Sequence, residues 1–280
     1  MTETTGHPTA GPIGIFDSGL GGLTILDGIR RRMPQYDYIY LGDNARAPYG
    51  IRSFDVVHQF TLQATRKLFQ LGCPLVILAC NTASAKALRS IQQKYLPQAA
   101  PDRRVLGVIR PTAEIIGTLT STRHIGILAT EGTVRSESYK MEITKLYPDT
   151  TVTGQACPMW VPLVENNEYD KPGADYFVKD SIQKLLSTDP LIDTIILGCT
   201  HYPLLLPKIR QYVPDHIKLV PQGEYIAESL EDYLRRHPDK EGRITRGATC
   251  RYYTTESSEK FRELASIFLH EDITVTNITL

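Results

Sequence analysis

Residues 75–84, with the sequence LVILACNTAS, decide the fold of this chain. Five consecutive apolar residues predict a strand that is buried on both faces, as in parallel sheets. The strand ends at Cys80, and the short polar residues after it suit the start of a helix expected over 85–89. Because ligands bind at the carboxyl ends of strands in open α/β sheets, we expect Cys80 to lie at a site.

The same construction occurs a second time in the chain. Residues 194–203, TIILGCTHYP, again form an apolar stretch that ends at a cysteine, Cys199. In addition, IGIFDS at 13–18 recurs as IGILAT at 125–130. The two repeats are separated by similar distances along the chain, which indicates two related α/β halves. If the halves face each other, the two cysteines approach one cleft from opposite sides.

The composition is that of an ordinary globular protein, with 280 residues, of which 41% are hydrophobic and 22% charged. This length suffices for one large or two medium domains. Lys plus Arg and Asp plus Glu both number 31, so the formal net charge is zero. We therefore predict neither nucleic acid nor a membrane as a partner. No apolar run reaches the ~20 residues of a membrane helix.

Alternating strands and helices predict two pseudo-symmetric α/β domains with mainly parallel sheets and an active site at their interface. Further strands are expected at 38–41, 105–109, 151–156, from Lys218, at 250–254 and at 273–276, and helices at 22–32, 53–71, 136–146, 174–186, 224–237 and 259–269. The elements after Lys218 have no counterpart in the first half, so we expect them to return to the first domain. That domain then comprises 1–108 and 214–280, and the second comprises 109–213.

Five cysteines, an odd number without tight CxxC spacing, argue against a disulfide framework or a zinc ribbon. We expect free thiols and a cytoplasmic location. Cys73, Cys157 and Cys250 are best interpreted as small buried hydrophobes. For Cys80 and Cys199 we expect reactivity instead, because a helix N-terminus lowers the pKa of a thiol from its free value of ~8.5. Residues 1–12 lack the apolar core of a signal peptide and are expected to form a mobile tail.

A pair of thiols on opposite walls of a cleft suits the transfer of a proton from one face of a carbon to the other. One thiol removes a proton and the other returns one, and thiol pKa values lie near enough to neutrality for both roles. A metal is not required, although Cys80, Cys199, His201 and Asp17 could together form a zinc site. The glycine-rich turn at 17–22 matches neither a Rossmann fingerprint nor a P-loop, so we expect no nucleotide and no other cofactor.

Three polar residues could serve the thiols or be ordinary structural groups. His201 lies two residues after Cys199 and is a plausible partner for it, although a lone histidine is more often a core or surface residue. Asp17 follows the first strand and could be a turn or cap residue. Glu165 ends a short apolar turn at 161–165, and alone it is best interpreted as a solvated helix end.

Four segments together carry a resemblance to a known family. IFDSGLGG at 15–22, PYG at 48–50, CNTAS at 80–84 and GCTHYP at 198–203 resemble the signature segments of the bacterial glutamate racemases of the aspartate/glutamate racemase superfamily. They match in order and approximate spacing from residue 13 to about residue 213. The resemblance implies two α/β domains, an active site between them and no cofactor. It also implies that two cysteines exchange the Cα proton of glutamate and so supply D-glutamate for peptidoglycan.

The resemblance also implies a role for individual residues. Cys80 and Cys199 correspond to the acid/base thiols, with Asp17 expected beside the first and His201 beside the second. The residues that would bind the carboxylates and ammonium of glutamate are Asp17, Ser18, Pro48, Tyr49, Gly50, Asn81, Thr82, Thr200, His201 and Glu165. Hydroxyls, amides and backbone N–H groups are good donors to anions. The stretches NNE at 166–168 and RPT at 110–112 depart from the pattern of the family.

Other functions stay open at this point. Aspartate racemase is the alternative within the superfamily, although Ser84 and the pair Thr200–His201 favour glutamate. A noncatalytic amino-acid-binding protein would have no use for thiols on both walls of its cleft. A hydrolase with a cysteine nucleophile would use one thiol with a histidine base. The sequence does not decide the oligomeric state, and we leave a homodimer open.

Overall fold

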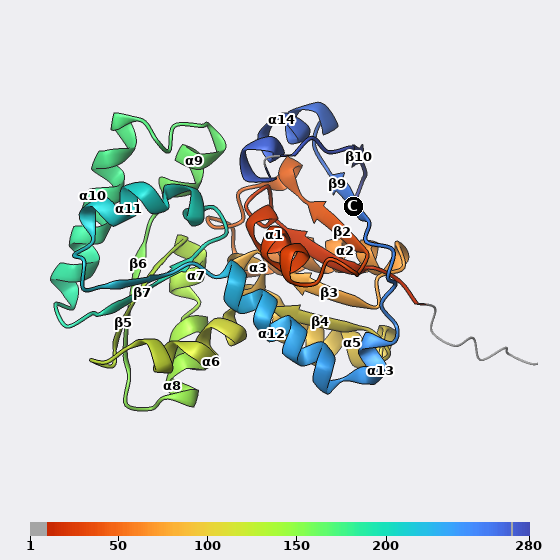
Figure 1. Ribbon diagram of the computed structural model, residues 1–280, viewed down its shortest axis with the longest axis horizontal. Coiled ribbons are helices and arrows are strands. Elements are labelled where there is room, and N and C mark those ends of the chain that lie inside the picture. Colours follow the sequence, from red (N-terminus) through yellow and green to blue (C-terminus); the bar gives the residue numbers. More distant parts are fainter. Residues whose placement is uncertain (1–9, 270) are drawn as a thin grey trace, which may run out of the picture.

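The computed structural model describes residues 10–269 and 271–280 and contains two α/β lobes, each built on a parallel sheet (Figure 1). The first sheet has the order β10-β9-β2-β1-β3-β4 and the second the order β6-β5-β7-β8. The strands are β1 (Ile13–Asp17), β2 (Tyr38–Gly42), β3 (Leu75–Leu78), β4 (Arg104–Gly107), β5 (His124–Ala129), β6 (Thr151–Ala156), β7 (Thr194–Gly198), β8 (Lys218–Val220), β9 (Cys250–Thr254) and β10 (Val275–Asn277). Mainly parallel sheets in an α/β fold were predicted from the sequence, and this prediction is confirmed.

The two sheets share one internal order. β1 lies between β2 and β3, and β5 lies between β6 and β7 in the same way. The sequence repeats fall on equivalent strands, since IGIFDS contains β1 and IGILAT covers β5 from its second residue. β3 and β7, which precede the two cysteines, are therefore equivalent as well. The first sheet is longer only because β9 and β10 extend it beyond β2.

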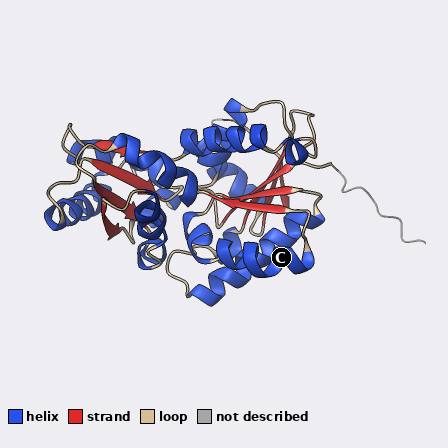
Figure 2. Ribbon diagram, turned by 90° about the horizontal axis from the view of Figure 1, so that it is seen from below, coloured by secondary structure: helices blue, strands red, loops and turns tan. Residues whose placement is uncertain are grey.

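Both faces of the first sheet are apolar, which explains its unbroken hydrophobic strands. Ile13 and Ile15 of β1 belong to one buried cluster, whereas Phe16 belongs to another on the opposite face. Successive side chains of a strand alternate between faces, so β1, β2 and β3 each contribute to both clusters. Figure 2 shows helices on both sides of the strands.

Six predicted helices lie within two residues of their expected bounds, whereas the helix expected at 85–89 begins earlier, at Asn81. In the first lobe the helices are α1 (Leu23–Arg32), α2 (Phe54–Gln70), α3 (Asn81–Lys86), α4 (Leu88–Ser90), a π-helix η2 (Ile91–Tyr95), α5 (Leu96–Ala99), α12 (Gly223–Arg236), α13 (Pro238–Glu241) and α14 (Ser258–Leu269), with a 3₁₀ turn η1 (Asn44–Arg46). In the second lobe they are α6 (Ile109–Leu119), α7 (Glu131–Arg135), α8 (Ser138–Leu146), α9 (Trp160–Glu165), α10 (Pro172–Thr188), a 3₁₀ turn η3 (Tyr202–Leu205) and α11 (Leu206–Tyr212). None of the helices in the described part of the chain is long and apolar enough to cross a membrane.

The return to the first lobe comes later than the sequence suggested. We expected residues from 214 onward to belong to the first domain, but β8 pairs with β7 in the second sheet. The chain crosses back only after Val220, and Ile226 and Leu230 of α12 then pack into a core cluster of the first lobe. A short strand carries no signal for the sheet that it joins, and this caused the error. The division into two domains otherwise stays a prediction.

Two residues at the end of the predicted tail are buried. Residues 1–9 lie outside the described residues. Gly11, however, donates from its N–H to Arg243 O (3.0 Å) and accepts at its carbonyl from Thr245 N–H (3.0 Å). Gly11 and Pro12 are buried. The prediction of a mobile segment is therefore wrong for these two residues, because Gly11 is hydrogen-bonded to a distant part of the chain and Pro12 is buried next to it.

Candidate active site

The two strand-end cysteines are both buried. Cys80 follows β3 and Cys199 follows β7, and their exposed fractions are 4% and 7%. Figure 1 shows α3, which begins directly after Cys80, near α7 of the second lobe at the junction of the lobes. Thr82 of α3 is also hydrogen-bonded to Thr130 before α7, with 2.9 Å between the hydroxyl oxygens. The segment after Cys80 is therefore in direct contact with the opposite lobe.

Cys80 occupies the N-cap position of α3. Its Sγ accepts from Ala83 N–H (3.4 Å), and the thiol lies 3.4 Å from Ser18 Oγ. Burial, and to a smaller extent the nearby Asp17 carboxylate, raise the pKa of Cys80 to about 12. Our expectation that the helix start would lower the pKa of Cys80 is wrong, because the loss of water around the sulfur outweighs the helix N-terminus. Cys80 therefore rests as a neutral thiol.

Cys199 has an imidazole as its neighbour. Its Sγ lies 3.8 Å from His201 Nδ1, and His201 Nε2 lies 3.2 Å from Glu165 Oε1. Burial disfavours the charged ring, but the contacts with Cys199 and Glu165 outweigh it and raise the pKa of His201 to about 10. The sequence predicted His201 beside Cys199, and this position is confirmed. Glu165 is not the solvated helix end that its pattern alone suggested.

Asp17 lies beneath the glycine-rich turn and is fully buried. Its Oδ2 accepts from Gly19 N–H (2.9 Å) and its Oδ1 from Thr200 Oγ1 (3.3 Å). Burial raises the pKa of Asp17, and the nearby His201 opposes this shift. Asp17 was predicted beside Cys80, and its carboxylate is close enough to affect that thiol. It also contacts the residue that follows the other thiol.

The loop at 48–50 contributes to the junction through its backbone, whereas its tyrosine ring is buried within the first lobe. Pro48 follows a cis peptide bond. Gly50 O accepts from Gly132 N–H of the second lobe (2.8 Å). The Tyr49 hydroxyl donates to Asp43 Oδ2, and burial raises the pKa of Tyr49 well above its usual value. The Tyr49 hydroxyl is therefore engaged with a side chain of its own lobe.

Sequence reasoning missed several residues of this region. Asp43 is fully buried and accepts from Tyr49, from Arg46 Nε (2.7 Å) and from Thr255 Oγ1 (2.8 Å). Its only sequence signal was its position in an irregular loop after a strand. Thr130 could have been found, since it occupies the place in the second half that Ser18 holds in the first. Tyr139, whose hydroxyl donates to Asn81 Oδ1, carried no signal.

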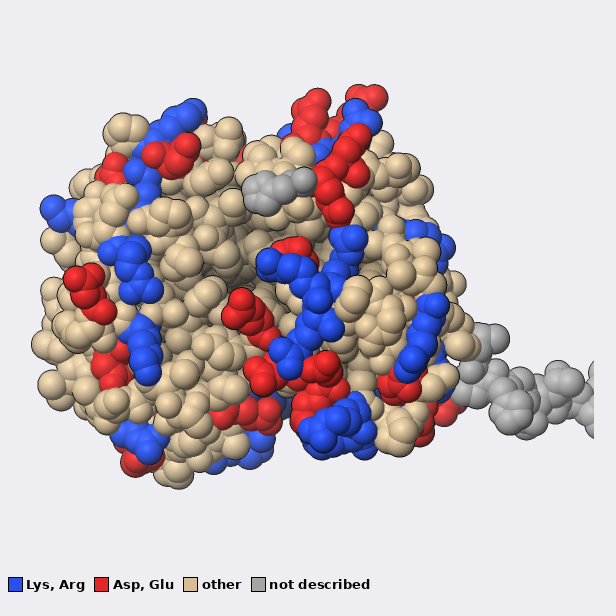
Figure 3. Space-filling view, viewed as in Figure 1, with Lys and Arg blue, Asp and Glu red and all other residues tan. Residues whose placement is uncertain are grey.

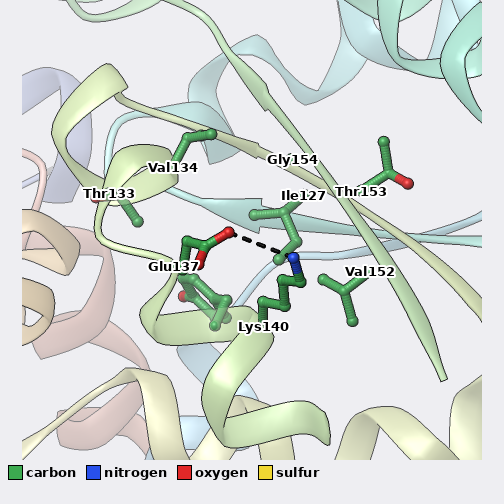
Figure 4. Close-up of a pocket in the computed structure, with 9 residues that line it drawn as sticks. Ile127, Thr133, Val134, Glu137, Lys140, Val152, Thr153 and Gly154 are labelled. Atoms are coloured by element: carbon green, nitrogen blue, oxygen red, sulfur yellow. Dashed lines mark hydrogen bonds and ion pairs between the residues drawn. The ribbon is translucent and has the colours of Figure 1, made fainter. Parts of the chain in front are cut away.

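The cavities elsewhere contain none of these thiols. Figure 4 shows a cavity of about 310 Å³ whose lining includes Val134, Val152 and Gly154, with an ion pair between Lys140 and Glu137 (3.3 Å) at its side. A second cavity of about 870 Å³ lies among α4, α6, α8 and α12. Basic and acidic side chains lie intermixed on the face seen in Figure 3, in agreement with the neutral composition.

The chemistry available at the site is that of thiols, an imidazole and carboxylates. All five cysteines are free. Within residues 10–269 and 271–280, no group of three or more His, Cys, Asp or Glu residues is arranged to hold a metal ion. The four-ligand zinc site that we considered from the sequence is thus not formed by Cys80, Cys199, His201 and Asp17.

Comparison with known proteins gives a consistent result. The family described as Asp/Glu/Hydantoin racemase matches residues 24–228. A glutamate racemase of Carnobacterium sp. (strain St2) is 40% identical over 272 residues, covering 96% of this chain and 98% of the relative. The structure is similar to that of glutamate racemase isoform RacE1 from Bacillus anthracis, with a TM-score of 0.88, 33% identity and coverage of 98% and 99%. A glutamate racemase from Francisella tularensis in complex with D-glutamate has a TM-score of 0.84, 28% identity and coverage of 96% and 97%.

Proposed function

Because the chain belongs to the Asp/Glu/Hydantoin racemase family, we propose that it is a glutamate racemase, an isomerase that interconverts L- and D-glutamate. The observation that carries the proposal is the equivalent placement of Cys80 and Cys199 after β3 and β7 of two similarly ordered sheets. Each thiol is buried and has a different titratable neighbour. Relatives with the printed name glutamate racemase align over nearly the whole chain.

The reaction we propose is a two-base proton transfer. One cysteine, as a thiolate, takes the proton from Cα of glutamate and becomes a thiol. The other cysteine, as a thiol, gives its proton to the opposite face of the same carbon and becomes a thiolate. The configuration at Cα is then inverted, and no atom other than hydrogen has moved. Proton exchange restores the starting states of the two sulfurs, so the thiols supply both the acid and the base without a cofactor.

The neighbours of the two thiols support the assignment of one cysteine as base and the other as acid. The His201 imidazole lies beside Cys199, where it can accept a proton from the sulfur or return one, and Glu165 contacts the other ring nitrogen. Cys80 is a buried neutral thiol beside Asp17, so its proton is ready for transfer. We propose that His201 and Asp17 tune these two proton transfers. The small polar groups Ser18, Asn81, Thr82 and Thr200 are proposed to bind the amino acid, with the backbone around Pro48 and Gly50.

The biological role follows from the product. We propose that the reaction takes place in the cytoplasm and supplies D-glutamate for peptidoglycan synthesis. A homodimer is part of the same proposal, and sedimentation of the purified protein tests it. A monomer across the working concentration range would refute that part alone.

The decisive experiment follows two signals in one reaction. The purified protein is incubated with L-glutamate in deuterium oxide, and circular dichroism and deuterium at Cα are recorded together. The expected result is decay of the dichroism to zero with deuterium in both enantiomers. Binding of glutamate without incorporation of deuterium at Cα would point to an amino-acid-binding protein. Covalent trapping of one cysteine without racemisation would point to a hydrolase. Faster turnover of L-aspartate than of L-glutamate would favour the alternative substrate.

A further inference from the structure

A buried chain of hydrogen bonds runs from the crossing between the lobes to the residue after Cys80. Gln222 lies between β8 and α12, where the chain returns to the first lobe. Its Nε2 lies 2.7 Å from Thr112 Oγ1 and 2.6 Å from the Tyr139 hydroxyl. The Tyr139 hydroxyl in turn contacts Asn81 Oδ1. Gln222, Tyr139 and Asn81 are at most 3% exposed, so water does not compete with these bonds.

The direction of each bond in this chain is fixed by proton count. Thr112 Oγ1 donates its single proton to Val108 O (3.0 Å), so it can only accept from Gln222. The side-chain NH₂ of Gln222 therefore faces Thr112 and Tyr139. Since the Tyr139 oxygen accepts from Gln222, its own proton is free for Asn81. Asn81 must accept that proton with its amide oxygen.

The chain of hydrogen bonds ends at the amide nitrogen of Asn81. Asn81 Nδ2 is buried and finds no hydrogen-bond acceptor among the described residues. Buried donors are almost always paired, so an unpaired one next to an acid/base thiol calls for an explanation. The missing acceptor matches a carboxylate oxygen of the bound amino acid, since a carboxylate accepts and never donates when ionised.

We propose that Tyr139 and Gln222 are positioning residues that fix the orientation of the Asn81 amide, with its NH₂ held ready for a substrate carboxylate. This inference rests on the proposed function. An asparagine side chain has nearly the same shape after rotation by 180° about its last bond, so packing alone does not choose between its two ends. The rotated amide would present its oxygen to the carboxylate and repel it. The donor from Tyr139 excludes that orientation.

The positioning also depends on contact between the lobes. Asn81 begins α3 of the first lobe, whereas Tyr139 belongs to α8 of the second. Separation of the lobes would break the bond between them and free the amide to rotate. The orientation required for binding is thus set only when the two lobes meet.

The test uses Tyr139→Phe, which removes the donor and keeps the ring. We expect KM for glutamate to rise about tenfold, on the scale of one lost hydrogen bond to a charged partner, while kcat changes less than about threefold. The matched control is Tyr147→Phe, at the end of the same helix, where the hydroxyl donates to Glu114 O (2.6 Å). The control should keep the wild-type KM. Thermal denaturation of each variant accompanies the kinetics.

A double-mutant cycle separates positioning from general stability. If Tyr139 acts through Asn81, Tyr139→Phe should change KM by less than about twofold in an Asn81→Ala background. Gln222→Met should raise KM about threefold in the wild-type background. Without the amide of Gln222 as a donor to its oxygen, the Tyr139 hydroxyl is no longer forced to direct its proton toward Asn81. Gln222→Met also carries the test if Tyr139→Phe does not fold. The inference would be overturned if Tyr139→Phe raised KM by the same factor in both backgrounds. It would also be overturned if Tyr139→Phe lowered kcat by as large a factor as it raised KM. Absence of racemisation by the wild-type protein would instead refute the proposed function.

Discussion

Thr200 Oγ1 lies 3.3 Å from Asp17 Oδ1, so the residue that follows one thiol is hydrogen-bonded to a carboxylate on the opposite lobe. The same carboxylate raises the pKa of Cys80, and His201 opposes the upward shift that burial imposes on Asp17. The environments of the two thiols are therefore coupled through Asp17. A change on either wall of the site is expected to alter proton transfer on both.

The glycine turn should tolerate no side chain at Gly21. A Cβ there would lie 2.5 Å from His201 Nδ1 and would also overlap Thr200 Oγ1. Displacement of an assisting group by about 1 Å costs on the order of 10²-fold in rate, so Gly21→Ala should lower kcat/KM by about that factor. The control is Gly173→Ala in α10, where an added Cβ meets nothing within 4 Å. Wild-type kinetics in Gly21→Ala would show that His201 is not needed at this position.

Removal of either thiol should abolish racemisation in both directions. Each turnover needs one sulfur as base and the other as acid, so Cys80→Ala and Cys199→Ala are expected to fail alike. The measurement is the loss of dichroism from each pure enantiomer. Cys73→Ala serves as the control, because Cys73 is buried before β3, at the end of the strand opposite to Cys80. Retention of more than about a tenth of the wild-type rate by either variant would contradict the two-thiol scheme, since acid/base groups contribute about 10²-fold or more.

His201 and Asp17 should affect the rate more than binding. Replacement by uncharged asparagine, in His201→Asn and Asp17→Asn, is expected to lower kcat by roughly 10²-fold while changing KM much less. The equilibrium constant must stay at unity because the enantiomers have equal free energy in water. Because the ratio of kcat/KM in the two directions equals this constant, kcat/KM from L-glutamate and from D-glutamate should fall by the same factor. Unchanged kcat with a raised KM would make the residue a binding group instead.

The raised pKa of His201 predicts a loss of stability at alkaline pH. The folded pKa of about 10 exceeds the ordinary value of 6.5, so the folded state holds the proton more tightly than the unfolded state. The resulting stabilisation is fully present below pH 6.5 and is lost as the pH rises through about 10. The melting temperature should therefore fall over this range, and His201→Asn should lack that part of the fall. The exposed His216 provides the control His216→Asn, and identical profiles for all three proteins would refute the prediction.

Removal of metal ions should leave the activity unchanged. The two thiols supply the acid and the base, so no Lewis acid is needed at Cα. The purified protein is dialysed exhaustively against a chelator and assayed with both enantiomers. Activity that disappears on dialysis and returns with one added metal would disprove the proposed mechanism.

The sequence predicted the positions of the thiols because strand ends carry strong signals. Long apolar runs followed by small polar residues identify β3 and β7, and the repeats identify their equivalence. The pKa of Cys80 was mispredicted, because the extent of burial depends on packing across both lobes. Gln222 could not be found, since its partners are more than eighty positions away in the chain. Glu165 became meaningful only once the fold placed it beside His201.

The addition of β9 to the edge of β2 has a consequence for synthesis of the chain on the ribosome. β2 is buried along its whole length, yet its outer neighbour consists of residues 250–254, which are translated long after it. All four strands of the second sheet have left the ribosome before that point. Until then the nascent chain carries an apolar strand with an open hydrogen-bonding edge, the kind of surface that promotes aggregation. A polypeptide that terminates before residue 250 would keep that edge permanently, so premature termination late in the message should yield insoluble product.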